Sequence, residues 1–219
     1  GANLLPRLEI RDGANNVVVT GPDSTAQVTL SLFSGTGTLN GTLVLTAVAG
    51  VVNFTAAETV NVTVPGVKVM AATKADTTAY TGTNQMTVNS NNFTITNAAA
   101  TTLVWTTHPA NPSTAGGDLL PVIEIRDTHG NVVTTGIDAT ALITLSVNTG
   151  TGSLNGTVAK QAAAGVVSFL AAQSLDFTVA GAKVLTATKA DLSGGGGAGA
   201  LNANSAGFTI NNSAATTLV

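Results

Sequence analysis

Six aspartates stand at matching positions in the two halves of the sequence and are the residues best placed to bind a ligand. They are Asp12, Asp23, Asp76, Asp127, Asp138 and Asp191. A hard cation such as Ca²⁺ takes about six to eight oxygen ligands, which the carboxylates and amides of clustered loops can supply. However, no DxDxDG run is present, and Asp followed by Gly or Asn is also the ordinary composition of a turn. We therefore predict no metal-ligating residue and no cofactor, and keep Ca²⁺ at a domain junction as the alternative.

The two histidines do not form a catalytic or metal site in the sequence. His108 and His129 each occur in one half only, in a Pro-rich or Gly-rich loop, and neither has a second histidine at metal-ligand spacing. No Ser-His-Asp set, pair of active-site carboxylates or nucleophile elbow can be assembled in both halves. We therefore predict that the protein is not an enzyme, with no catalytic and no cofactor-binding residue.

Two lysines are expected to face inward. Lys68 and Lys183 share strand parity with Met70 and Leu185, which should lie in a core. A buried ammonium group is costly unless it is paired. A Lys–Asn isopeptide bond would remove the charge, and the alternative is a side chain whose ammonium group reaches water.

Composition limits the classes of partner. The chain has 219 residues, of which only 9% are charged, and a net charge of -3, so it has no basic face for nucleic acid. Cysteine is absent, which excludes disulfides and thiolate sites. No apolar run approaches the roughly 18 residues that span a bilayer, so we expect no membrane insertion in this segment. Because the chain begins with Gly1 and lacks an export signal, we interpret it as a piece of a longer or processed protein.

The sequence repeats itself with a period of 115 residues. Residues 1–104 align without a gap to residues 116–219, and more than half of the aligned positions are identical. GTGTLNGT at Gly35 recurs as GTGSLNGT at Gly150, and ATKAD at Ala72 recurs at Ala187. A length of 219 residues therefore divides into two ordinary domains rather than one large domain.

The repeat also indicates a missing strand. Residues 105–115 occur once, so the first copy lacks the segment that opens the second. We predict an immunoglobulin-like repeat at 1–97 without its opening strand, a second repeat at 98–212, and at 213–219 an opening strand without a domain. The segment around residues 98–105 would link the two domains. Either the chain belongs to a longer array, which we favour, or the last strand of one subunit completes the first domain of the next.

Alternating residues predict β-strands. In residues 141–147 (ALITLSV), Ile143 and Leu145 point to one face and Thr144 to the other, and residues 27–32 repeat the pattern. Residues 122–126 (VIEIR) alternate likewise, and their Glu124 and Arg126 should pair on the outer face. Asp, Gly and Asn at regular spacing supply turns, including an Asn-Gly hairpin signal in GTGxLNGT. The pattern predicts an all-β protein of two tandem antiparallel β-sandwiches with very little helix.

The strings that carry this pattern also resemble a known family. They are TTLVWTTHPANPSTAGGDLLPVIEIRDTHGNVVTTG, ITLSV, GTGSLNGT, AAAGVVSF and AGAKVLTATKAD. Together they resemble the bacterial immunoglobulin-like (Big-type) tandem repeats of large cell-surface proteins, adhesins and autotransporter passengers, over essentially the whole chain. The resemblance implies an immunoglobulin-like fold and an extracellular or cell-surface location. Lys68 and Lys183 stand where that family usually has Tyr, so no tyrosine corner is implied.

We predict a structural repeat module of a prokaryotic extracellular or cell-surface assembly, such as a stalk, a filament or a surface-layer component. Its partners would be neighbouring copies of itself or further repeats of the same chain, with head-to-tail strand addition as one route of polymerisation. Other surface proteins and glycans are further candidates. The alternative is an adhesin recognition module that binds a glycan or a host protein through loops at a sandwich end, and a third is an accessory domain of a secreted enzyme. Recognition would favour exposed aromatics, but the single Trp, Trp105, is expected to fill the core, which leaves Tyr80.

Overall fold

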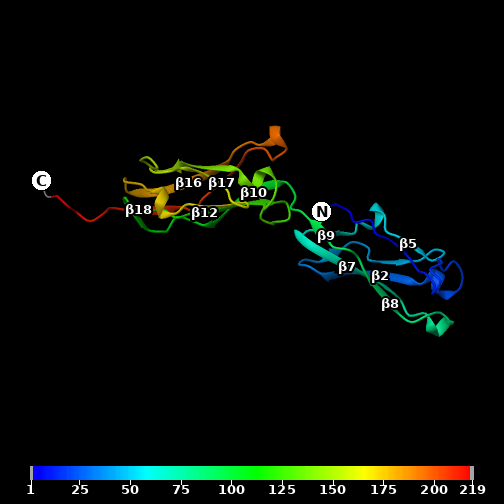
Figure 1. The fold of residues 1–219 in the computed structure, drawn as a ribbon. Helices are drawn as coiled ribbons and strands as arrows, with labels where there is room; N and C mark the ends of the chain where they lie inside the picture. The colour runs from blue at the N-terminus through cyan, green and yellow to red at the C-terminus, as the bar shows by residue number, and fades with distance from the viewer. Residues whose placement is uncertain (1, 218–219) are drawn as a thin grey trace. The chain divides into compact units, whose positions relative to one another are not determined.

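The computed structural model describes residues 2–217 and divides into two compact units, Gly1–Thr96 (unit 1) and Asn97–Val219 (unit 2). Each unit consists of strands joined by turns and by 3₁₀ helices of three or four residues (Figure 1). The prediction of an all-β protein with little helix is therefore confirmed. Within the described range, no helix has the length and apolar character needed to cross a lipid bilayer.

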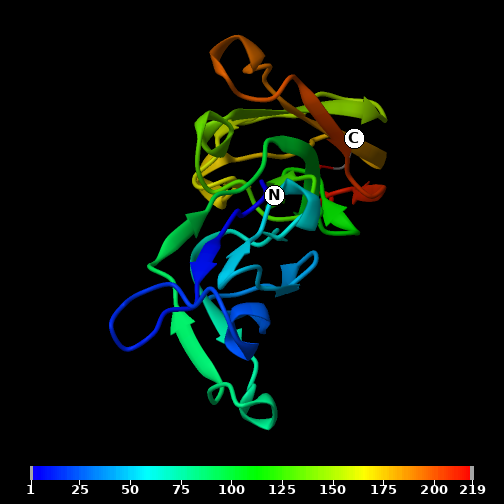
Figure 2. The same cartoon turned by 90° about the vertical axis from the view of Figure 1, so that its right-hand side faces the viewer.

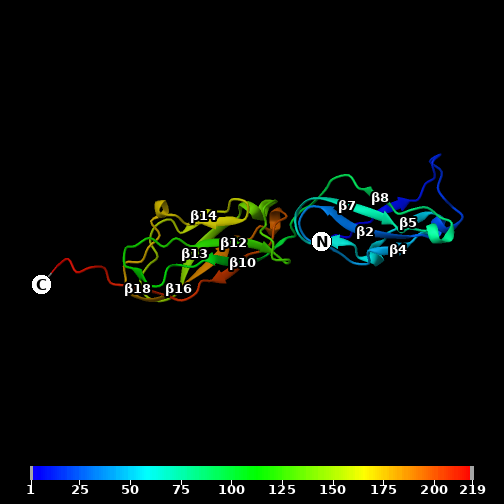
Figure 3. The ribbon, with the colours of Figure 1, turned by 90° about the horizontal axis from the view of Figure 1, so that it is seen from below.

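Unit 1 is built around one larger sheet. The order in this sheet is β4-β2-β7-β8, with β9 also paired to β7, and Figure 3 labels β2, β4, β7 and β8. Two smaller sheets, β1-β5 and β3-β6, complete the unit. The elements are β1 (Arg7–Glu9), η1 (Pro22–Thr25), β2 (Gln27–Ser34), β3 (Leu39–Asn40), β4 (Val44–Thr46), β5 (Val51–Asn53), η2 (Ala56–Glu58), β6 (Asn61–Val62), β7 (Gly66–Lys74), η3 (Thr78–Tyr80), β8 (Met86–Asn89) and β9 (Phe93–Ile95).

Unit 2 has the same plan, with two strands at its start that unit 1 lacks and an isolated bridge, Asn155 with Asp176, where unit 1 has β3 and β6. Its larger sheet has the order β11-β18-β16-β13-β14, with β17 also on β16, and its smaller sheet has the order β10-β12-β15. The elements are β10 (Ala100–Thr107), β11 (Ser113–Thr114), β12 (Val122–Asp127), η4 (Ile137–Thr140), β13 (Leu142–Thr149), β14 (Ala159–Gln161), β15 (Val166–Ser168), η5 (Ala171–Gln173), β16 (Gly181–Lys189), η6 (Ser193–Gly195), β17 (Leu201–Asn204) and β18 (Phe208–Asn211).

The central strand pair has the same register in both units. Leu30 of β2 lies opposite Ala72 of β7, and Leu145 of β13 lies opposite Ala187 of β16, 115 residues later in each strand. In β13 the predicted alternation is confirmed, since Ile143 and Leu145 are buried while the residues between them are exposed. Each unit encloses its own cluster of buried apolar side chains. Burial of these inward faces is the main driving force for folding.

Three local features differ from the sequence-based expectations. The strands on either side of Asn40 and Gly41 do not pair with each other, because β3 pairs with β6 and β4 with β2, so the predicted hairpin at this Asn-Gly is wrong. Most of the segment predicted to link the domains belongs to β10, a core strand of unit 2, and the units divide at residues 96 and 97. The pairing of β11 with β18 is parallel, an exception in an otherwise antiparallel arrangement.

Two strand connections extend away from the strands. The connection that carries η3 joins β7 to β8, and the one that carries η6 joins β16 to β17. Both protrude from the body of their own unit (Figure 2). The Gly-rich stretch at 192–200 forms the tip of a hairpin, because β16 and β17 pair antiparallel on either side of it.

The units differ most clearly at the opening strand. In unit 2, β10 pairs along β12, with Leu103 opposite Ile125 and Trp105 opposite Ile123. In unit 1, β1 pairs only with β5, and residues 2–96 contain no counterpart of β10. The predicted absence of an opening strand from the first sandwich is therefore confirmed.

Candidate functional site

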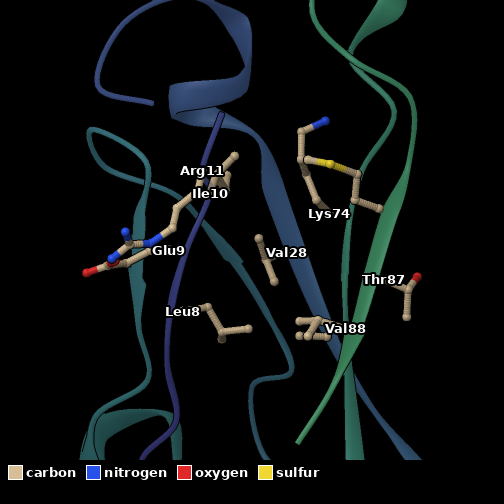
Figure 4. A pocket seen from close by; sticks show the side chains of 10 residues that line it. Leu8, Glu9, Ile10, Arg11, Val28, Lys74, Thr87 and Val88 are labelled. Atoms are coloured by element: carbon tan, nitrogen blue, oxygen red, sulfur yellow. The ribbon is translucent and has the colours of Figure 1, made fainter. Parts of the chain in front are cut away.

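Unit 1 has an open groove between β1 and β8, which we call the strand groove. It consists of two adjoining hollows of ≈ 170 and ≈ 160 Å³. Figure 4 shows Leu8, Val28 and Val88 around the first hollow. Leu8 and Val88 line both hollows, and the wall is predominantly apolar. The residues that define the groove are Leu8, Ile10, Val28, Met70, Ala72 and Val88.

The corresponding space in unit 2 is filled by β10. This strand pairs with β12 on one side, and on the other the indole Nε1 of Trp105 donates a hydrogen bond to the carbonyl oxygen of Ala203 in β17 (3.0 Å). The prediction that Trp105 fills the core is confirmed, since its side chain is buried in the main apolar cluster of unit 2. The strand groove is therefore the place that an opening strand occupies in the other copy.

Apolar side chains along the groove are slightly more exposed than their counterparts in unit 2. Ile10 retains 7% exposure and Met70 9%, whereas Ile125 and Leu185 at the matching positions of unit 2 are fully buried. Val88, at the rim, is 60% exposed. Apolar side chains left in water forfeit the free energy of burial, about 25 cal/mol per Å² of apolar surface. The groove is consequently a surface that gains from being covered.

A buried ion pair lies beside the groove in unit 1 and recurs in unit 2. Lys74 Nζ is 2.8 Å from Asp23 Oδ1, and Lys189 Nζ is 2.8 Å from Asp138 Oδ1. Lys74 is 4% exposed and Lys189 is fully buried. Each ammonium group also donates to backbone carbonyl oxygens, those of Ala75 and Thr83 in the first case. Each lysine is the last residue of a central strand (β7 or β16), and its aspartate lies in the 3₁₀ helix that precedes the neighbouring strand (β2 or β13). Each pair therefore fixes the larger sheet of its unit at one end.

The carboxyl group of Asp23 has a pKa well below its usual value. Burial alone raises this pKa, but hydrogen bonds from Lys74, Thr77 and Thr83 stabilise the charged form and outweigh it. The amide of Thr83 donates to the carboxylate at 3.1 Å, and the hydroxyl of Thr77 also donates to it. In unit 2 the amide of Ala198 donates to Asp138 at 2.9 Å. In each unit, this carboxylate therefore binds the backbone at the base of the protruding hairpin tip.

The other candidate metal ligands lie in separate turns. Asp127 is buried and accepts from the amides of Ala98 (3.0 Å), His129 and Asn131. Its counterpart, Asp12, is exposed and accepts from Ala14 and Asn16.

Asp76 and Asp191 accept from Thr78 and Ser193 at the base of the hairpin tips. No three acidic or histidine residues among those described come together as a metal site. Asp12, Asp76, Asp127 and Asp191 act here as acceptors that shape turns, whereas Asp23 and Asp138 also form the buried ion pairs.

The remaining candidates have structural partners. His108 is exposed, stacks on Trp105 and accepts a hydrogen bond from the amide of Ala206 (2.9 Å). Lys68 and Lys183 are buried, as predicted from their strand parity. Lys68 donates to the carbonyl of Pro65 (3.1 Å), and the ammonium group of Lys183 lies 5.4 Å from the centre of the Phe177 ring. Carbonyl oxygens and a cation–π contact thus partner these ammonium groups.

No protein-family model and no curated protein matches the chain. Among solved structures, the D0-D1 domain of intimin is similar at 14% identity with a TM-score of 0.33, over 94% of this chain and 88% of that one. Domains 4 and 5 of the S-layer protein SbsC match at 12% identity with a TM-score of 0.34, over 94% and 80%. A β-glycosidase from Bacteroides vulgatus matches at 12% identity with a TM-score of 0.38, over 94% of this chain and 24% of that one. All three TM-scores are below 0.5.

Sequence reasoning missed the buried Lys–Asp pairs. It singled out Asp23 and Asp138 as repeated acids but placed them with turn residues, and it did not consider Lys74 or Lys189. A signal was present, because Lys74 lies two residues after the inward-facing Ala72 in the recurring ATKAD motif. A repeated inward Lys together with a repeated unexplained Asp is the pattern that would have predicted the pair.

Proposed function

We propose that the chain is a structural repeat module of a prokaryotic extracellular or cell-surface assembly, whose role is to hold distance and shape. One observation carries this proposal, namely that the two units repeat the same central register and the same buried ion pair 115 residues apart. Each unit encloses its own apolar core, so units of this kind can be added along a chain without altering their neighbours. The resemblance of the sequence to surface-protein repeats agrees with this role.

The pairing of β11 with β18 supports a load-bearing role for unit 2. Ser113 lies opposite Ile210 and Thr114 opposite Asn211 in parallel, so β11, which follows the opening strand β10, pairs with the last strand of the unit. When the ends of the unit are pulled apart, strands paired in parallel slide past each other, and their hydrogen bonds must break together rather than one after another. Unit 1 has no counterpart of β11 among its described residues.

We further propose that the chain is not catalytic, and that recognition of a glycan or host protein is not its main role. The candidate polar residues are engaged in turns and ion pairs within their own units. Of the single Trp and the single Tyr, Trp105 is buried, and Tyr80 alone is exposed. A sugar-binding surface normally presents several exposed aromatic rings for stacking.

Stretching single molecules of the full chain between its ends tests this function. We expect two separate unfolding events, each releasing about 30 nm of contour length at about 3.5 Å per residue. Unit 2 should unfold at the higher force, and Ser113→Pro, which removes an amide from β11, should lower that force while leaving the first event unchanged. Extension without discrete unfolding events would count against a load-bearing module. So would equal unfolding forces for the two units that do not change with Ser113→Pro.

A further inference from the structure

We propose that Asn92 carries an N-linked glycan, and that this glycan covers an apolar patch on the outer face of the larger sheet of unit 1. The inference deepens the proposed function and rests on its extracellular location. The tripeptide Asn92-Phe93-Thr94 matches the acceptor sequence Asn-x-Ser/Thr of N-glycosylation. Both Asn92 and Thr94 are exposed, so a transferring enzyme can reach the amide and the hydroxyl that it recognises.

The modification joins a sugar to the side-chain amide of Asn92. Its donor is an oligosaccharide on a lipid diphosphate, and its catalyst is a membrane oligosaccharyltransferase. Transfer forms a bond from Nδ2 to the anomeric carbon of the sugar and breaks the bond from that carbon to the phosphate oxygen of the donor. The lipid diphosphate leaves with the electron pair, and the amide proton passes to a base of the enzyme.

Asn92 lies in an open part of the fold. It belongs to the connection between β8 and β9, and its side chain makes no hydrogen bond to another described residue. The matching residue of unit 2 is Gly207, which is also exposed although β10 and β11 are present there. A Cβ on Gly207 would meet nothing within 4 Å. Space for a side chain at this position is therefore a property that both units share.

The other five acceptor sequences are held within the fold. In three of them the asparagine Nδ2 donates a hydrogen bond to a neighbouring residue, and in the other two the asparagine lies in a paired strand. Either arrangement opposes the bending of the acceptor sequence into the site of an enzyme. The first three are Asn40, Asn61 and Asn155, and the other two are Asn53 in β5 and Asn211 in β18.

An exposed apolar patch lies beside Asn92. Phe33 of β2 is 64% exposed and Val67 of β7 is 58% exposed. Val67 lies opposite Thr94 of β9, and Phe33 lies in the bulge of β2 that faces Val69. Because neighbouring strands are about 4.8 Å apart, Phe33 on one side of β7 is roughly 10 Å from Asn92 on the other, which a short oligosaccharide spans.

Unit 2 has neither the patch nor the acceptor sequence. In place of the two exposed apolar side chains it has Asn148 and Ala182, and in place of the acceptor asparagine it has Gly207. The patch and the acceptor sequence therefore occur together in one copy and are absent together from the other. A glycan over the patch accounts for this, because it shields apolar surface from water. It also hydrates a face on which the outward residues of β2, β7 and β9 carry no charge.

Mass spectrometry of the protein from its natural source tests the site. Trypsin cleaves after Lys and Arg, so Asn92 falls in the peptide of residues 75–126, which contains no other acceptor sequence. This peptide should show the mass shift of one oligosaccharide, and fragmentation should place the sugar on Asn92. In the same source, Asn92→Gln and Thr94→Val should lose the shift, whereas Asn91→Gln, which leaves the acceptor sequence intact, should keep it. An unmodified peptide, or a sugar that persists in Asn92→Gln, would overturn the proposal.

A soluble paramagnetic probe tests whether the glycan covers the patch. In NMR spectra of the native chain and of Asn92→Gln, the probe should relax the ring protons of Phe33 at least roughly twofold faster once the bulky glycan is lost. Tyr80 is the matched control, because its ring is 75% exposed and lies at the hairpin tip between β7 and β8. Its relaxation should stay the same. Unchanged relaxation at Phe33 would refute the placement of the glycan over the patch.

The site and the structural role fail separately. An unmodified Asn92 in a chain that shows two unfolding events under force would refute the glycan and leave the structural module supported. A glycan on Asn92 in a chain that extends without discrete unfolding events would support the site and contradict the module.

Discussion

The indole Nε1 of Trp105 donates a hydrogen bond to the carbonyl oxygen of Ala203 at 3.0 Å, which joins the opening strand of unit 2 to β17 in the larger sheet. Through this contact and its pairing with β12, β10 closes the space between the two sheets. Unit 1 has the same sheets with that space open. Comparison of the two units within one chain therefore shows what an opening strand contributes to closing the space between the sheets.

Replacing Trp105 with Ala should destabilise unit 2 alone. The side chain is 8% exposed, and loss of a large buried aromatic costs about 3–5 kcal/mol of unfolding free energy. In urea titrations followed by circular dichroism, the transition of unit 2 should move to lower urea while that of unit 1 stays in place. Tyr80→Ala is the control, because its side chain is 75% exposed and its loss should cost less than about 0.5 kcal/mol. Equal effects of the two substitutions would contradict the assignment of Trp105 to the core.

Removing one partner of the buried ion pair of unit 2 should lower the unfolding free energy more than removing both partners. Lys189→Met leaves Asp138 buried without its counter-charge, which should lower the unfolding free energy by about 3–5 kcal/mol. The double variant Lys189→Met/Asp138→Leu removes both charges and should recover a large part of that loss. Urea denaturation of both variants measures the difference. If the double variant were no more stable than the single one, an unpaired buried carboxylate could not be the cause.

Stability should fall in acid because several carboxyl groups, Asp23 and Asp127 among them, have a pKa below the usual range. Burial raises the pKa of Asp23 and of Asp127, but hydrogen bonds lower both by more, chiefly from Lys74 in the first case and from the Asn131 side chain in the second. The folded pKa therefore lies below the unfolded value of about 3.9, and the unfolded chain binds more protons as the pH falls.

The unfolding free energy should thus be constant above about pH 5 and decline progressively below it. Urea titrations between about pH 7 and pH 2 measure this decline. Asp23→Asn, which cannot ionise, should be less stable near neutrality and should lose less on acidification. A flat profile, or stability that increases in acid, would show that these carboxylates are not preferentially charged in the folded chain.

Alanine substitutions at two glycines distinguish the cost of backbone strain from the cost of steric contact. Gly130 and Gly156 both have positive φ, at 80° and 84°. A Cβ on Gly130 meets nothing within 4 Å, whereas a Cβ on Gly156 would lie 2.2 Å from the carbonyl oxygen of Ser174. Gly130→Ala should cost about 1–2 kcal/mol from left-handed strain alone, and Gly156→Ala should cost clearly more. Equal losses in thermal or urea unfolding would contradict the close packing of the GTGSLNGT turn.

The sequence was sufficient to predict features that depend on neighbours along the chain. The alternation at Ile143 and Leu145 and the pairing of Glu124 with Arg126, whose charged atoms are 2.6 Å apart, both follow from a period of two within one strand. The positive φ of the glycines in GTGSLNGT follows from their residue type. Comparison of the two copies was equally effective, because it located the missing strand without any structure.

Features that depend on distant segments were not predictable in this way. Lys74 and Asp23 meet because β7 pairs with β2 and carries its end to η1, a relation that local periodicity does not contain. The strands flanking Asn40–Gly41 pair with other strands for a similar reason, since each contributes to a different sheet. A turn signal specifies backbone conformation locally but not which strands will pair.

Hydrogen exchange can be measured separately for each backbone amide along the open edge of β1. The amide of Ile10 donates to the carbonyl of Gly50, on the side of β5. Because successive residues of an antiparallel strand direct their amides to opposite edges, the amides of Glu9 and Arg11 point toward the groove. The matching residues of unit 2, Glu124 and Arg126, lie opposite Val104 and Thr102 of β10.

Hydrogen exchange measured by NMR at these four amides is therefore the most direct measurement of whether unit 1 is an open copy of unit 2. At protein concentrations too low for self-association, the amides of Glu9 and Arg11 should exchange rapidly and those of Glu124 and Arg126 slowly. Addition of the peptide with the sequence of residues 97–107 should slow only the first pair. Equal protection in both units before any strand is added would contradict the account.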